Sequence, residues 1–227
     1  MVIILKKILF IFVLIFIVGC TQARDFSYGV SQLDNIDSKY NTTVETYPNN
    51  IPEIDLMINE LKELKKLPLE KDQEPFNYLV DYKILNLEVE RMIIKGNKYG
   101  KSGTTKFGFG CKIRPLITES VSFRNKSSII GFEAVSLLRE FVDKYPEDAS
   151  SVGLSYKNSL FLNATFYQIS KEARRDSRVI NNFCPASTVL ELYQAEFRKK
   201  TNLSEDFINN LSYEEAAPIW KELRGIT

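Results

Sequence analysis

The chain has 227 residues, in which 30 Lys and Arg nearly balance 29 Asp and Glu, and histidine is absent. This balance argues against a protein that binds nucleic acid or a membrane surface through net positive charge. The absence of histidine excludes histidine metal ligands and Ser–His or Cys–His nucleophile pairs. We therefore expect no metal site, no other cofactor and no nucleic-acid partner.

The first twenty residues have the organisation of an export signal. Lys6 and Lys7 precede an apolar run over residues 8–18, which is shorter than the roughly 20 residues that a membrane span requires. Ile17-Val18-Gly19-Cys20 then resembles the lipobox of prokaryotic lipoprotein signal peptides. The resemblance implies that residues 1–19 are removed as a signal peptide and that the Cys20 sulfur receives a diacylglyceryl group.

An uncleaved N-terminal anchor helix is the alternative interpretation of this segment. In the first interpretation the protein contacts the membrane through the lipid on Cys20, and in the second through the helix itself. Both interpretations place the rest of the chain outside the cytoplasm, attached to a membrane.

Residues 20–50 have few large aliphatic side chains and many Asn, Asp, Ser and Thr, so they cannot bury enough apolar surface to order themselves alone. We predict a lipid-anchored flexible tether here, with an r.m.s. reach of roughly 30 Å. The alternative is that Phe26, Tyr28, Val30 and Leu33 dock this segment on the folded domain.

Residues 51–227 predict an all-α domain, organised as an irregular multi-helix bundle. Apolar periodicity and terminal signals place its helices at about 52–67, 74–95, 116–145, 147 or 152 to 176, and 186–200. Two short helices follow, which Ser204 and a Ser212–Glu215 capping box begin. Helix 74–95 is apolar on two faces, so we expect it to be the central helix.

Three local features of this domain are also expected. The third helix is expected to break near residues 125–128, and Pro218 is expected to kink or restart the last helix. In the fourth helix, Phe161, Phe166 and Ala173 are expected to face inward.

The segment 96–110 holds half of the ten glycines, so we predict a long glycine-rich loop with room for a small hairpin. Its Gly100-Lys101-Ser102 lacks both the earlier glycine and the preceding strand of a phosphate-binding P-loop. A nucleotide site is therefore not expected there.

Once Cys20 carries lipid, Cys111 and Cys184 remain as an even pair in an oxidising compartment, which predicts a disulfide. The bridge closes a loop of about 70 residues, and a chain-entropy estimate gives roughly 4 kcal/mol of stabilisation. A reactive thiol is the alternative, but the chain has no histidine to activate it.

Two further kinds of site can be named from the sequence. Asn41 and Asn125 are sequons in segments expected to be loop-like, and they are the candidate glycosylation sites. Arg174, Arg175 and Arg178 form a candidate anion-binding patch, for which the alternative is an ordinary cationic last helical turn.

No residue pattern marks a catalytic site. Several helix carboxylates offer material for a general acid–base pair, although their spacing singles out no two of them: Glu88, Glu90, Glu119, Glu133 and Glu140. We therefore predict an exported, membrane-anchored lipoprotein whose helical domain binds or scaffolds an unidentified envelope protein or polymer. The alternative is a carboxylate-dependent hydrolase that acts on envelope polymers.

Overall fold

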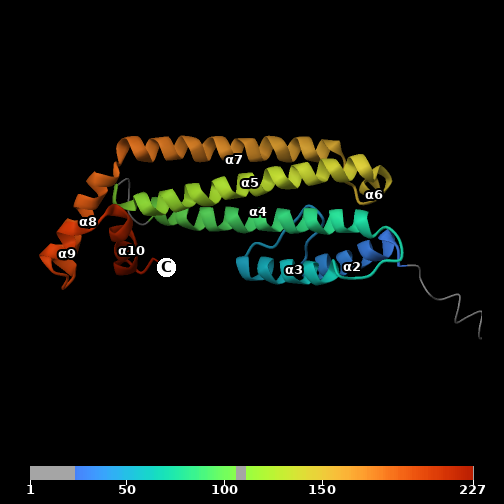
Figure 1. Ribbon diagram of the computed structural model, residues 1–227, viewed down its shortest axis with the longest axis horizontal. Coiled ribbons are helices and arrows are strands. Elements are labelled where there is room, and N and C mark those ends of the chain that lie inside the picture. The colour runs from blue at the N-terminus through green and yellow to red at the C-terminus, as the bar shows by residue number, and fades with distance from the viewer. Residues whose placement is uncertain (1–23, 106–110, 227) are drawn as a thin grey trace, which may run out of the picture. The chain divides into compact units, whose positions relative to one another are not determined.

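The computed structural model describes residues 24–105 and 111–226, and all regular structure among these residues is helical (Figure 1). The helices follow in the order α2 (Phe26–Lys39), α3 (Ile51–Leu64), α4 (Gln73–Thr105), the 3₁₀-helix η1 (Cys111–Ile113), α5 (Arg114–Lys144), α6 (Pro146–Ser151), α7 (Tyr156–Phe183), α8 (Ala186–Lys200), α9 (Glu205–Asn210) and α10 (Tyr213–Leu223). The predicted all-α bundle is confirmed. The predicted signal peptide and the lipidation site at Cys20 lie outside the described residues.

The chain folds into two compact units, each assembled from segments that are distant in the sequence. The first unit contains the described residues up to Pro48, together with Pro52–Ile84 and Leu137–Tyr156. The second unit contains Asn49–Ile51, Leu85–Ser136 and the chain from Lys157 onward. Helices α4 and α5 therefore contribute residues to both units.

In the first unit, aromatic side chains fix α2 beside α4 and α5. The ring of Phe26 in α2 lies 6.4 Å from that of Phe141 in α5, and Phe141 stacks on Tyr78 of α4 with the centroids 6.1 Å apart. Gly29 brings α2 so close to α4 that an added Cβ would lie 2.6 Å from the Phe76 ring. Burial of these few rings orders the helix.

The prediction of a flexible tether over residues 20–50 is wrong for the part that forms α2. Asp25 caps this helix by accepting a hydrogen bond from the Tyr28 backbone N–H, and Leu33 is fully buried. The segment orders because its few apolar residues recur on one face and meet an apolar partner surface, which composition alone does not reveal. The docking alternative thus describes this segment better than the tether does.

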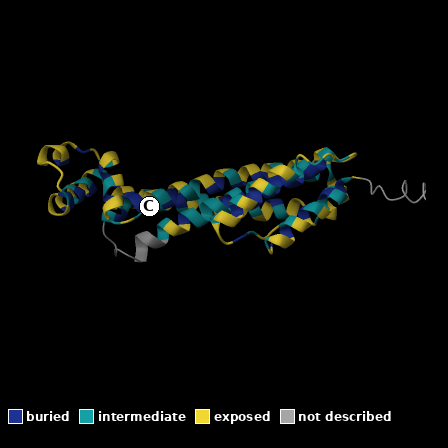
Figure 2. Cartoon of the chain, turned by 90° about the horizontal axis from the view of Figure 1, so that it is seen from below, coloured by how far each residue is buried: buried dark blue, intermediate teal, exposed yellow. Residues whose placement is uncertain are grey.

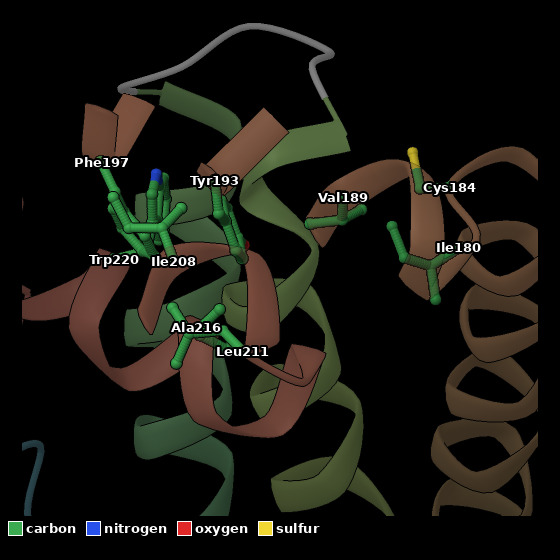
Figure 3. Packing of buried hydrophobic residues seen from close by; sticks show 10 residues of the cluster. Ile180, Cys184, Val189, Tyr193, Phe197, Ile208, Leu211, Ala216 and Trp220 are labelled. Atoms are coloured by element: carbon green, nitrogen blue, oxygen red, sulfur yellow. The ribbon is translucent and has the colours of Figure 1, made fainter. Parts of the chain in front are cut away.

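In the second unit, α7 runs alongside α5 (Figure 1). Phe166 of α7 packs with Val89 of α4 and Val135 of α5 in one hydrophobic cluster. Another cluster joins α8, α9 and α10 around Tyr193 and Trp220, whose ring centroids are 5.1 Å apart (Figure 3). These clusters bury the apolar stripes that the sequence periodicity indicates.

The predicted glycine-rich loop is wrong for residues 96–105, because α4 continues to Thr105. Gly96 and Gly100 are one turn apart and face α5, where the Ser120 hydroxyl donates a 2.7 Å hydrogen bond to the Gly96 carbonyl. An added Cβ on Gly100 would meet that hydroxyl oxygen at 3.2 Å. These glycines allow a close helix approach instead of ending the helix. Residues 106–110 lie outside the described residues.

Three other helices also differ from the sequence prediction, two in being continuous and one in ending later. Helix α5 has no break at residues 125–128, where the Ser127 and Ser128 hydroxyls donate to carbonyls three residues earlier, at 2.8 and 2.9 Å. Helix α7 extends to Phe183 instead of ending near residue 176. Pro218 lies inside α10 without interrupting it. Local hydrogen bonding and packing thus override residues that often end helices.

Buried positions elsewhere follow the expected faces of the helices (Figure 2). In α3 the buried residues are Ile54, Met57, Ile58 and Leu61, as the 3.6-residue period predicts. The capping box at Ser212 is present, so the predicted start of α10 is confirmed. None of the helices in residues 24–105 and 111–226 combines the length and the apolar character that a bilayer span requires.

Candidate functional site

Buried residues that recur every seven positions fix the orientation of α7 about its own axis. These residues are Ser159, Phe166, Ala173 and Ile180. Gly131 of α5 leaves room for Phe166, because an added Cβ at this glycine would lie 2.5 Å from the ring. The residues on the opposite side of α7 consequently face solvent.

The side of α7 that faces solvent carries large apolar side chains, an unusual feature for a surface helix. Phe161 is 72% exposed and Phe183 is 77% exposed, and Leu160, Tyr167 and Val179 are exposed as well. The expectation that Phe161 faces inward is therefore wrong, whereas Phe166 is buried as expected. The apolar residues gather toward the two ends of the helix.

Four basic side chains occupy the stretch of α7 between these apolar ends. Lys171, Arg174, Arg175 and Arg178 line a hollow of about 640 Å³, together with neighbouring residues of the same helix. We use the name α7 outer face for Leu160, Phe161, Tyr167, Lys171, Arg174, Arg175, Arg178, Val179 and Phe183. The three arginines of the candidate anion patch thus lie together on one exposed side of one helix.

The α7 helix is electropositive, since it carries five basic and two acidic residues. The carboxylate of Asp176 lies 3.2 Å from the Arg124 guanidinium of α5 and 3.3 Å from that of Arg175. Among the described residues, no carboxylate lies within ion-pair distance of Lys171 or Arg178. Positive charge on the α7 outer face is therefore only partly neutralised within the chain.

A different group of charges surrounds Glu196 of α8, which is only 6% exposed. Its carboxylate lies 2.5 Å from Arg224 and 3.0 Å from Lys200. The Lys112 ammonium is 3.5 Å away, and the Trp220 indole N–H donates to the carboxylate at 3.3 Å.

The state of the Glu196 carboxyl follows from these neighbours. Burial by itself raises its pKa, but hydrogen bonds from Lys200 and Arg224, with the charges of Arg224 and Lys112, lower the pKa to about 2. A carboxyl with so low a pKa is a poor proton donor near neutral pH. We interpret Glu196 as the residue that holds α10 against α8.

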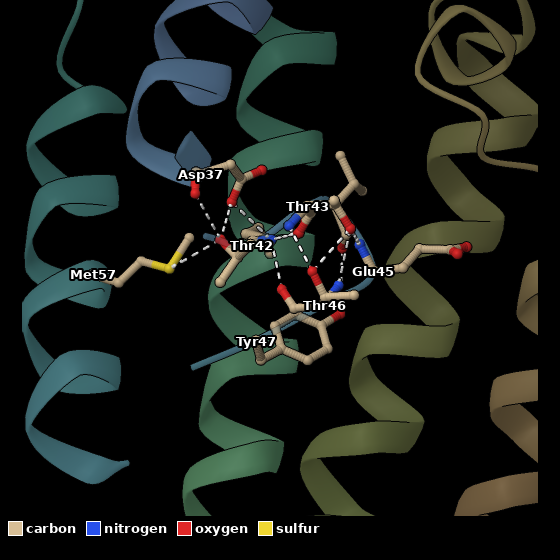
Figure 4. Close-up of polar contacts among 9 residues, drawn as sticks. Asp37, Thr42, Thr43, Glu45, Thr46, Tyr47 and Met57 are labelled. Carbon is tan, nitrogen blue, oxygen red and sulfur yellow. Dashed lines mark hydrogen bonds and ion pairs between the residues drawn. The ribbon is translucent and has the colours of Figure 1, made fainter. Parts of the chain in front are cut away.

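A buried lysine of the first unit, Lys83 of α4, holds the turn that follows α2. Lys83 is fully buried, and its ammonium lies 3.0 Å from an Asp37 carboxylate oxygen. It also donates to the backbone carbonyls of Thr43 and, at 3.3 Å, of Thr46. The Thr42 hydroxyl donates to the same Asp37 oxygen at 2.7 Å (Figure 4). Burial lowers the pKa of Lys83, and the charge of Asp37 opposes this shift.

The predicted cysteine pair lies at disulfide distance, with the sulfur atoms of Cys111 and Cys184 2.05 Å apart and the Cα atoms 5.2 Å apart. The pair ties η1 to the residue that follows α7. Polar contacts hold the same place, since the Tyr193 hydroxyl donates to the Lys112 carbonyl at 2.8 Å. Arg114 donates to the Cys184 carbonyl, also at 2.8 Å. This region is therefore fixed by both covalent and polar contacts.

Two of the carboxylates considered for catalysis pair with a lysine. Glu140 lies 2.8 Å from the Lys144 ammonium and accepts a 2.7 Å hydrogen bond from Tyr78. Glu119 pairs with Lys221 of α10. The hydrogen bonds from Lys144 and Tyr78 lower the pKa of Glu140.

The other three carboxylates lie in varied surroundings. Glu88 is 3.9 Å from Arg91 in the next helical turn, and Glu133 is exposed on α5. Burial raises the pKa of Glu90.

The two candidate glycosylation sites differ in their backbone surroundings. Asn41 is exposed in the turn after α2 and has a left-handed φ of 52°, which Asn tolerates better than most residues. Asn125 lies inside α5 and is only partly exposed, so its expected placement in a loop is wrong.

Sequence reasoning did not single out Lys83, Glu196 or the exposed end residues of α7. Lys83 offered a signal, because it stands three residues after Val80 and four before Leu87 on a stripe that is otherwise apolar. Glu196 likewise stands beside Phe197 in the apolar stripe of α8. A charged residue inside an apolar stripe thus indicated a buried ion pair in both units.

Comparison of this chain with protein-family models, with curated proteins and with solved structures found no match. The proposal below therefore rests on the chemistry of the described residues and on the N-terminal sequence.

Proposed function

We propose that the chain is an exported lipoprotein, anchored through Cys20, whose helical domain binds a partner at the cell surface or in the envelope. The anchor is supported by the sequence of residues 1–20. The binding role is supported above all by the α7 outer face, with its exposed aromatic side chains and unneutralised cations.

The composition of the α7 outer face favours protein binding over a role as an ordinary solvated surface. Interface centres are enriched in Phe, Tyr and Arg, and an exposed ring such as Phe161 or Phe183 gains free energy when a partner removes it from water. A helix that faces only solvent gains nothing from rings at these positions.

The anchor is tested by intact-mass analysis of the protein from its native membrane fraction. We expect a mass that begins at Cys20 and includes a diacylglyceryl group. A mass that retains Met1, or a Cys20→Ser variant that is still cut and lipid-modified, contradicts the anchor.

The binding role is tested by a pull-down from the native envelope with the lipidated protein as bait. We expect the double variant Phe161→Ser/Phe183→Ser to lose a partner that the wild type retains. Phe207→Ser is the matched control, because Phe207 is 48% exposed on α9, away from α7. Capture of the same proteins by the wild type and the double variant contradicts binding through α7.

A further inference from the structure

We infer that the α7 outer face binds an acidic amphipathic helix of a partner protein, whose carboxylates lie at its centre and whose apolar residues lie toward both ends. This inference deepens the proposed function and rests on it, because it names the chemistry of the bound partner. It follows from the order of side chains along α7: apolar at residues 160, 161 and 167, then mainly basic at 171–178, where four cations outnumber Glu172 and Asp176, and apolar again at 179 and 183.

The spacing of the exposed residues suits a helical partner. Exposed positions recur at Leu160, Tyr167, Lys171, Arg174 and Arg178, intervals of three, four and seven that form a ridge along one helix. From residue 160 to residue 178 this ridge spans roughly 27 Å, and the exposed rings of Phe161 and Phe183 lie beside it near its two ends. A second helix can lie along it and place its own side chains in the hollow beside the basic residues.

The charge of the face requires an acidic partner. Asp176 already contacts Arg124 and Arg175, and Glu172, which lines the same hollow, accepts a 2.9 Å hydrogen bond from Gln168. Among the described residues, Lys171 and Arg178 therefore form no ion pair. Burying these cations under a neutral helix would remove them from water without compensation. Carboxylates at the centre of the partner helix supply this compensation, and they also fix the register of the two helices.

A second copy of this chain fits the face poorly. If two copies of α7 lie antiparallel so that Phe161 meets Phe183, the two-fold axis falls near residue 172. Lys171 of one copy then lies near Arg174 of the other copy, and these like charges repel. A parallel arrangement likewise sets each cation against its own counterpart.

A bilayer surface also fits less well than a helix. A helix that lies in a membrane interface buries a continuous apolar strip in the acyl region. On α7 that strip is interrupted by four cations around a hollow, where a partner side chain fits and a flat lipid surface does not. The helical partner satisfies both the apolar ends and the basic centre.

The test uses the full chain in nonionic detergent and a fluorescent synthetic helix of about 24 residues, with Glu at its centre and Leu toward both ends. We expect anisotropy to show binding that weakens between roughly 50 mM and about 500 mM salt. Lys171→Glu/Arg178→Glu should weaken binding at least about tenfold. The matched control, Lys62→Glu/Lys199→Glu, changes the net charge equally at exposed positions outside α7 and should bind like the wild type.

Three results overturn the inference. The first is equal binding of a peptide with Gln in place of every Glu, and the second is the absence of binding by either peptide. The third is measured by trypsin digestion of the full chain in phosphatidylcholine vesicles. If adding about 30% phosphatidylglycerol protects α7 in the wild type but not in Lys171→Glu/Arg178→Glu, the face binds anionic lipid. If the envelope pull-down still depends on Phe161 and Phe183, the proposed function stands although the acidic helix does not.

Discussion

The two units each fix a short segment around buried charge, but they do so with different chemistry. In the first unit the turn after α2 is held by one buried cation, Lys83, which contacts one carboxylate and two backbone carbonyls. In the second unit η1 is held by the Cys111–Cys184 pair and by the contact of Lys112 with Glu196. The Lys83 site is wholly buried. The η1 site includes a covalent bond, and the cations around Glu196 stay partly exposed to water.

This difference determines what each site tolerates. The side chains of Lys112 and Lys200 around Glu196 are 41% and 52% exposed, so each can return to water if the carboxylate is removed. Asp37 is 4% exposed and has no comparable route, so loss of Lys83 leaves a buried charge without its cation. The Lys83 site should therefore be the more sensitive of the two to substitution.

The largest effect is expected for Lys83→Met, which keeps most of the side-chain volume but removes the cation. We expect the free energy of unfolding to fall by about 3–5 kcal/mol, measured by urea denaturation. Lys65→Met is the matched control in the same unit, since Lys65 pairs with Asp81 at 2.6 Å but is 39% exposed, and it should cost less than about 1 kcal/mol. Adding Asp37→Leu to Lys83→Met should recover a large part of the loss. If Lys83→Met and Lys65→Met lower the free energy of unfolding equally, the buried ion pair is no more sensitive to substitution than the exposed one.

Loss of the covalent link comes next. The cysteines are 73 residues apart, so replacing both by Ala should cost about 4 kcal/mol at most and lower the melting temperature by several degrees. Hydrogen exchange should increase mainly around η1 and the start of α8, and little in the turn after α2. If alkylation of the denatured but unreduced protein labels both cysteines, the bridge is absent from the protein in solution.

The sequence predicted the elements that depend on local signals. The bounds of α8, the Ser204 cap and the Ser212 capping box follow from short patterns, and the cysteine pair follows from counting. Long-range packing explains the rest: α2 packs through Phe26 against Phe141 of α5, and the glycines of α4 lie where α5 approaches closely. The partner surfaces of these contacts cannot be read from the segment concerned.

The candidate site could be predicted only in part, because some of its features also depend on long-range packing. Arg174, Arg175 and Arg178 are close in sequence and helical, so their common side could be inferred. The exposure of Phe161 could not be, because an aromatic residue in an amphipathic helix is usually buried. In the structure Gly131 leaves room for the Phe166 ring, and Phe161, on another side of α7, faces solvent.

A smaller effect is expected for Glu196→Gln, since its cations can be solvated again. We expect a loss of about 1.5–3 kcal/mol near neutral pH, the range for hydrogen bonds to charged groups. The pKa of Glu196 is about 2 in the folded protein, below its ordinary value of 4.5, so the folded state holds fewer protons between these values. The stabilisation is thus complete above about pH 4.5 and is lost as the pH falls toward about 2.

Urea unfolding at a series of pH values checks this linkage to Glu196. The difference in unfolding free energy between the wild type and Glu196→Gln should shrink as the pH falls from about 5 to about 2. A difference that stays constant over this interval would show that Glu196 contributes through packing, not through its charge.

The smallest effect is expected at the start of α10, the helix that carries Trp220 and Arg224 to Glu196. The Ser212 hydroxyl accepts from the Glu215 backbone N–H at 3.3 Å, while the Glu215 carboxylate accepts from the Ser212 backbone N–H at 2.8 Å. Ser212→Ala removes the first of these bonds, together with the 2.8 Å bond that the hydroxyl donates to the Glu215 carboxylate, and keeps the second. We therefore expect a loss of about 1 kcal/mol by urea denaturation.

Ser212→Thr is the matched variant, because its hydroxyl can accept from the same N–H and also donate to the Glu215 carboxylate, so it should retain most of the stability. Combining Ser212→Ala with Glu196→Gln distinguishes two ways in which α10 can be held. If the cap acts only on the helix end, the two losses add, as they do for independent sites. If the cap also sets the position of Trp220 and Arg224 at Glu196, the double variant loses less than the sum. We expect additivity, because α10 is already fixed by the buried Trp220 ring against Tyr193.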